Sequence, residues 1–79
     1  MSSYRPSNLE TNAIAVRVNG EERNVAPSTT VSALLADLGL EEDRVAVELD
    51  REIVSRPLWG STTLAPGSSI EVVHFVGGG

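Results

Sequence analysis

The sequence has no cysteine and no lysine, and each absence excludes a kind of chemistry. Without cysteine, the 79-residue chain can form no disulfide bond, no thiol nucleophile and no thiolate metal site. Its single histidine leaves too few ligands for an ordinary zinc cluster. All six cationic residues are arginines, so the chain offers no ε-amine for conjugation to itself.

Long apolar runs are also missing. No stretch approaches the roughly 18 apolar residues of a membrane-spanning helix. The opening residues, MSSYRPSNLETN, lack the apolar core of a secretory signal. We therefore expect a cytoplasmic protein without a membrane partner.

Acidic residues outnumber arginines, and the net charge is -5. Because nucleic-acid binding depends on Lys and Arg side chains that neutralise phosphates, this balance argues against a nucleic-acid partner. It favours a basic protein partner, which the negative field would steer toward the chain. The hydrophobic content of 41% is sufficient for one small globular domain and too high for a disordered chain.

The first half of the sequence predicts two strands and a helix. Apolar residues alternate over positions 14–18, and Asn19-Gly20 then predicts a type I′ turn, since both central positions of that turn need positive φ. Residues 21–25 follow as a peripheral return strand. Thr30 is the expected N-cap of the helix, and Gly39 is the glycine expected to end it. Between them, apolar residues recur with the spacing of a short amphipathic helix: Val31, Leu34, Leu35 and Leu38.

The second half predicts shorter elements. Residues 41–43 form an acidic, solvated connector, and residues 57–59 form a tight loop or a single helical turn. We expect Trp59 to anchor the small core. Turns are expected at Asp50-Arg51 and at residues 65–68. Apolar residues alternate over positions 45–49, which predicts the next strand. Two further strands are predicted, a short return strand at 52–54 and the last strand at 69–76.

The order strand, strand, helix, strand, strand indicates an α+β domain with its helix on one face of the sheet. If the first and last strands are neighbours, they run parallel at the sheet centre, and the intervening chain supplies the crossover. We expect Leu35 and Val47 to be buried between helix and sheet. This domain covers residues 13–76, between a flexible arm at residues 1–12 and a flexible glycine tail at residues 77–79.

The last strand breaks its own alternation. Its inward positions follow Ile70, and its outward positions follow Glu71. The later outward positions, Val73 and Phe75, are nevertheless apolar. Since no second helix is available to cover them, we expect both side chains to be exposed as a partner-binding surface. The alternative is that the loop at residues 55–65 folds over them.

His74 lies within the same strand. A catalytic base would need an orienting carboxylate and a nucleophile, and the sequence identifies neither. We therefore expect His74 to pack or to form a hydrogen bond at the strand edge. The sequence shows no phosphate loop, metal-ligand spacing or Ser/His/Asp arrangement, so we expect no enzyme.

The sequence ends with three glycines after this strand. Glycine loses more conformational freedom on folding than any other residue, so these residues cannot stabilise the strand. Extended, they span roughly 10 Å, and without side chains they could thread a narrow channel into another protein's active site. The terminal carboxylate is ionised at neutral pH and is a poor electrophile. Adenylation with ATP would activate it, and the adenylate could then accept sulfur and become a thiocarboxylate.

Four segments carry a resemblance to a known family: NGEE after the first strand, TVSALLADLGL in the helix, RVAVELDREIVSRPLW, and GSSIEVVHFVGGG at the end. Over residues 13–79 the sequence resembles the ThiS family, the sulfur carriers of thiamine biosynthesis. The resemblance implies a β-grasp, ubiquitin-like fold, in which a mixed sheet of four to five strands packs on one main helix.

The resemblance also implies a mechanism and partners. An E1-like adenylyltransferase of the ThiF type would use ATP and magnesium to activate Gly79, and a sulfur-transfer protein would help to convert it to the thiocarboxylate. A thiazole synthase of the ThiG type would then take up the sulfur. Gly77 and Gly78 would thread the partner's channel. The chain itself would bind no cofactor or metal and would be a co-substrate rather than an enzyme.

Three positions depart from the common family pattern and put only local turns in doubt: Asp50, Ser55 and Ser68. Other functions stay open beside the thiazole pathway. A sulfur carrier for molybdopterin synthesis would use the same terminal chemistry with a different acceptor. A ubiquitin-like modifier would form isopeptide bonds to target lysines, and a plain interaction module would leave the glycines inert.

Overall fold

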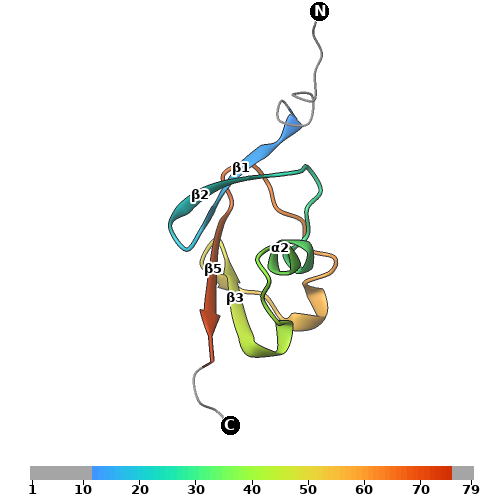
Figure 1. Cartoon of the computed structure of the whole chain (residues 1–79), viewed down its shortest axis with the longest axis vertical. Helices are drawn as coiled ribbons and strands as arrows, with labels where there is room; N and C mark the ends of the chain where they lie inside the picture. Colours follow the sequence, from blue (N-terminus) through green and yellow to red (C-terminus); the bar gives the residue numbers. More distant parts are fainter. Residues whose placement is uncertain (1–11, 76–79) are drawn as a thin grey trace, which may run out of the picture.

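The computed structural model describes residues 12–75, which form a five-stranded mixed sheet with helix α2 on one face (Figure 1). The predicted α+β architecture is confirmed. In chain order the elements are β1 (Ile14–Val18), β2 (Glu21–Val25), α2 (Val31–Asp37), η1 (Glu42–Arg44), β3 (Val45–Leu49), β4 (Glu52–Ile53), η2 (Arg56–Leu58) and β5 (Ser69–His74).

A tight turn joins β1 to β2. Asn19 and Gly20 have φ angles of 51° and 87°, which are the positive values that a type I′ turn requires. The two strands pair antiparallel from Ile14 opposite Val25 to Val18 opposite Glu21. Strand β2 forms one edge of the sheet, so its predicted peripheral position is confirmed.

Both ends of α2 are capped as the sequence predicts. The Thr30 side chain accepts a hydrogen bond from the Ala33 N–H at 3.0 Å. At the other end Gly39 has a φ of 75°, and the Leu40 N–H donates to the Leu35 carbonyl at 2.9 Å. This is the hydrogen-bond pattern of a Schellman motif. The predicted apolar stripe runs one residue past the helix, because Leu38 is its C-cap.

Strand β5 lies at the centre of the sheet, in the order β2-β1-β5-β3-β4. It runs parallel to β1, with Arg17 opposite Ser69, and this confirms the predicted parallel pairing of the first and last strands. On its other side it runs antiparallel to β3 as far as His74 opposite Val45. Two predicted strands are longer than the observed ones: β5 ends at His74, with Val76 outside the described residues, and β4 ends at Ile53.

The segment between β4 and β5 packs against the start of α2. The backbone N–H groups of Val31 and Ser32 donate to the carbonyls of Thr62 and Trp59, at 2.9 and 3.1 Å. Trp59 is 2% exposed and donates its Nε1–H to the Val54 carbonyl at 2.8 Å, so its predicted role as a core anchor is confirmed. This segment therefore lies on the helix side of the sheet.

The core lies between α2 and the sheet. Leu35 on the helix is 0% exposed and Val47 on β3 is 1% exposed, as predicted. The other buried apolar residues are Val16, Val18, Val31, Leu34, Val45, Trp59, Leu64, Ile70 and Val72. Burial of this apolar surface is the main force that holds helix and sheet together.

Candidate functional site

Strand β5 is the element that leads to the C-terminal glycines. The last described residue, Phe75, donates its backbone N–H to the Arg44 carbonyl at 2.9 Å, which extends the pairing with β3 one position beyond His74. The sheet therefore holds the chain in place up to Phe75. The predicted site residues Gly77, Gly78 and Gly79 lie outside the described residues.

Val73 and Phe75 are exposed, and the alternation along β5 directs them to the face of the sheet that α2 does not cover. Their exposed fractions are 57% and 56%, whereas Ile70 and Val72, which point to the helix side, are buried. At the end of the sheet Phe75 also lines a hollow with Leu40 and Arg44. The predicted exposure is confirmed. The alternative, that residues 55–65 cover them, is wrong, because that loop is hydrogen-bonded to the start of α2 on the other side. Their role in partner binding stays a prediction.

The same face carries further apolar side chains. Ala46 on β3 is directly opposite Val73. Ile53 on β4 is opposite Glu48, which is itself opposite Glu71, so Ile53 also points to this face. With an exposed fraction of 79%, Ile53 is a residue that the sequence reasoning missed. We call these four residues the open-face patch: Ala46, Ile53, Val73 and Phe75.

Acidic side chains lie within the open-face patch. Glu48 and Glu71 are directly opposite each other on β3 and β5. Ile53 is opposite Glu48 on β4, and Val73 is the next residue of β5 that points to the same face as Glu71. Like charges in this arrangement disfavour folding slightly. The face therefore presents apolar side chains together with two carboxylates, and with Arg17 of β1 opposite Ser69.

His74 is exposed, and the expectation that it packs is wrong. It points to the helix side, in phase with Ile70, but α2 ends at Asp37 and does not reach it. His74 instead lines a shallow hollow with Leu38 and Leu40. Within residues 12–75 its imidazole forms no hydrogen bond, so the expected edge hydrogen bond is absent there as well.

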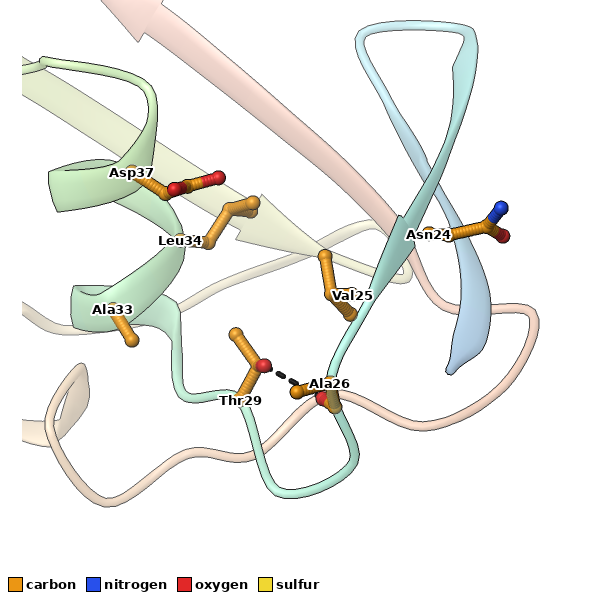
Figure 2. Close-up of a pocket in the computed structure, with 7 residues that line it drawn as sticks. All are labelled: Asn24, Val25, Ala26, Thr29, Ala33, Leu34 and Asp37. Carbon is orange, nitrogen blue, oxygen red and sulfur yellow. Dashed lines mark hydrogen bonds between the residues drawn. The ribbon is translucent and has the colours of Figure 1, made fainter. Parts of the chain in front are cut away.

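A groove on the helix side separates β2 from α2. Figure 2 shows Val25 and Leu34 on its two sides, and a 2.6 Å hydrogen bond from the Thr29 hydroxyl to the Ala26 carbonyl at one end. Its volume of about 320 Å³ is at the low end for a small-molecule site. Neither Val73 nor Phe75 lies in it, so the groove is separate from the open-face patch.

Residues 12–75 contain neither a metal-binding cluster nor a membrane-spanning helix. No group of three or more His, Asp or Glu side chains is placed to hold a metal ion. No helix in this part of the chain is long and apolar enough to cross a membrane.

Comparison with known proteins gives concordant results. A family model described as "ThiS family" matches residues 16–79. The sulfur carrier protein ThiS of Bacillus subtilis is 37% identical over 65 residues, which are 81% of this chain and 98% of that protein. A thiazole synthase of Magnetococcus marinus is 44% identical over 64 residues, 81% of this chain but only 20% of that protein. This chain thus spans about a fifth of the length of that relative.

A solved structure agrees with these matches. The crystal structure of the thiamine biosynthesis protein ThiS from Geobacter metallireducens superimposes with a TM-score of 0.73 at 35% identity, and covers 84% of this chain and 100% of that one. The match confirms the β-grasp fold that the sequence resemblance implies, with its mixed sheet and main helix. Because the family match includes all of β5 and the glycines after it, this chain belongs to the ThiS family.

Proposed function

We propose that this chain is a sulfur carrier of thiamine biosynthesis, and that the carboxylate of Gly79 carries the sulfur. The observation that carries the proposal is that the family match includes the central strand β5 and continues to Gly79. The sulfur carrier protein ThiS of Bacillus subtilis is similar to this chain over 98% of its own length, which supports the same conclusion.

The chemistry at Gly79 requires activation from outside the chain. An ionised carboxylate is a poor electrophile, and adenylation by ATP converts it to an acyl adenylate with release of pyrophosphate. A persulfide on a sulfur-transfer partner then displaces AMP to form an acyl disulfide. A second thiol of that partner attacks the partner's own sulfur atom, which releases the thiocarboxylate and leaves the two partner sulfurs joined as a disulfide. The chain has no cysteine, so any sulfur that it carries is bonded to its terminal carbonyl carbon.

The partners follow from these steps. We assign the activation to an E1-like adenylyltransferase of the ThiF type, which binds the ATP and magnesium, and we place it in the cytoplasm. We assign the uptake of sulfur to a thiazole synthase of the ThiG type. The support for the second assignment is that a thiazole synthase from Magnetococcus marinus contains a segment 44% identical to this chain.

The open-face patch is the proposed docking surface for these partners. Val73 and Phe75 lie a few residues before the glycines, so a protein that contacts them can also receive the tail in its active site. The exposed apolar side chains supply area for burial, and Glu48 and Glu71 favour a partner with cationic side chains near its contact surface.

Intact-mass spectrometry tests the proposal. After incubation with the cognate adenylyltransferase, ATP and a sulfur source, we expect the mass gain that replacement of one carboxylate oxygen by sulfur produces. A matched variant with one residue added after Gly79 should fold normally and gain no sulfur. If the extended variant gains sulfur at full rate without being trimmed, Gly79 is not the carrier position. Covalent conjugates to other proteins would instead identify a modifier.

A further inference from the structure

Strand β5 extends well beyond the strand that it pairs with on one side. Its register with β1 covers two positions, Arg17 opposite Ser69 and Val18 opposite Ile70, and the chain then turns away into β2. On that side, β5 continues without β1 toward the glycines. A backbone N–H there that lost both water and a partner would destabilise the fold, so other groups must replace the missing strand.

Asn19 replaces it. Its backbone N–H donates to the Ile70 carbonyl at 2.8 Å, and its side-chain Oδ1 accepts the Val72 N–H at 2.8 Å. The side-chain oxygen thus stands where the next backbone carbonyl of β1 would be. The left-handed φ of 51° that turns the hairpin also directs this side chain toward β5, and asparagine tolerates that conformation better than most residues.

We infer that Asn19 is a positioning residue for the C-terminal tail. The inference rests on the proposed function. The Arg44 carbonyl holds Phe75 on the β3 side of β5, and the Asn19 side chain holds Val72 on the opposite side. With both contacts, the end of β5 from which the glycines follow is held on both sides. Without the Asn19 contact, the end of β5 is held on one side only.

The chain contains a matched control for this contact. Asp50 also has a left-handed φ, 52°, in a turn beside β5, and its Oδ1 accepts the Ser69 N–H at 2.9 Å. This contact is of the same kind, but it lies at the start of β5, far along the strand from the tail. Its loss should disturb the beginning of β5 and leave Val72 and Phe75 in place.

Amide hydrogen exchange tests the structural part of the inference. Asn19→Gly keeps a residue suited to positive φ and removes the acceptor, whereas Asn19→Asp keeps an acceptor oxygen. We expect Val72 to exchange about two- to tenfold faster in the glycine variant, the factor that corresponds to the net stabilisation of one hydrogen bond. The aspartate variant should retain the protection. Asp50→Gly should accelerate Ser69 and leave Val72 unchanged.

Sulfur loading by the cognate adenylyltransferase tests the functional part. If fewer molecules present the tail correctly at any moment, the apparent affinity falls by that fraction while the chemistry is unchanged. We expect the half-saturating carrier concentration to rise about two- to tenfold for Asn19→Gly, with an unchanged maximal rate. Asn19→Asp should restore the wild-type value, and Asp50→Gly should match wild type.

Three results overturn the inference. The first is an unchanged half-saturating concentration for Asn19→Gly although Val72 exchanges faster. The second is an equal effect of Asn19→Gly and Asp50→Gly, which would indicate general destabilisation. The third is unchanged exchange at Val72. Failure of the wild-type chain itself to gain sulfur would instead remove the proposed function, and the exchange data would still test the contact.

Discussion

Phe75 combines a fixed backbone with a free side chain. Its N–H is bonded to the Arg44 carbonyl, while more than half of its side chain is exposed. An aromatic ring in this position loses little conformational freedom when a partner covers it, and its apolar area is then removed from water. The residue is thus suited to binding and contributes little to the core.

Replacement of Phe75 with alanine should separate these two roles. We expect the free energy of unfolding to change by less than about 1 kcal/mol, as for other surface substitutions. The dissociation constant for the adenylyltransferase or the thiazole synthase should rise about thirtyfold, which corresponds to about 2 kcal/mol for an aromatic residue at the centre of an interface. Denaturant titration and calorimetric binding measure the two quantities.

Leu58→Ala is the matched control for this prediction. Leu58 is 54% exposed, much like Phe75, but it lies in η2, away from the open-face patch. It should change neither stability nor partner affinity by a large factor. If Phe75→Ala unfolds readily and the folded fraction binds with normal affinity, then Phe75 belongs to the core and the docking surface lies elsewhere.

At the scale of a single element, α2 shows how a short helix is held at its end. Gly39 adopts a φ of 75° to close it, and a Cβ added there would meet no atom within 4 Å. Any cost of a side chain at this position is therefore conformational rather than steric. The left-handed region disfavours residues with a Cβ by about 1–2 kcal/mol.

Gly39→Ala should accordingly lower the free energy of unfolding by about 1 kcal/mol. Gly60→Ala is the control, because Gly60 does not have a positive φ and its nearest potential contact is the Ser32 hydroxyl at 4.0 Å. We expect that variant to match wild type or to be slightly more stable, since alanine restricts the unfolded chain. Equal losses in both variants would contradict the conformational explanation.

The buried face of α2 gives a second prediction at this scale. Leu35 is fully buried, so its truncation to alanine should lower the free energy of unfolding by about 2–5 kcal/mol through lost burial and a residual cavity. That is a large part of the stability of a small domain. Urea titration measures it, and a loss well under about 1 kcal/mol would show that the site collapses or that the helix packs with a different face.

Much of the fold, and part of the candidate site, could be predicted from local patterns. The spacing of apolar residues and the Asn-Gly turn predicted the elements, and the broken alternation of β5 predicted the exposure of Val73 and Phe75. The exposure of His74 could not be predicted, because it depends on how far along β5 the helix α2 extends in space. Ile53 and the side-chain contact of Asn19 were missed for a similar reason: both depend on the register between strands distant in sequence.

At the scale of the whole molecule, the negative charge should act on the rate of association. A net charge of -5, with Glu48 and Glu71 on the open face, creates a field that attracts a basic partner before contact. Salt shortens the reach of this field from about 10 Å at 0.1 M to about 3 Å at 1 M. We therefore expect the association rate constant with the proposed adenylyltransferase, measured by stopped flow, to fall as salt is added. The dissociation rate constant of that complex should change little.

Glu71→Gln should weaken this salt dependence without a loss of stability, because it also removes the repulsion from Glu48. Glu42→Gln, in the connector before β3, is the matched control with the same change in net charge. An association rate that does not respond to salt, or an equal response to both substitutions, would mean that the charge around the open-face patch does not guide the partner.

Strand β5 is the last described element in the chain and the central strand of the sheet. Synthesis on the ribosome releases a protein N-terminus first, so both hairpins and the helix emerge before the strand around which they assemble. A chain interrupted before Ile70 lacks the parallel partner of Val18 and cannot close its core. It also lacks the glycines that follow β5. Folding of the sheet therefore depends on the same strand that precedes the proposed carrier position, and a chain truncated before β5 lacks both.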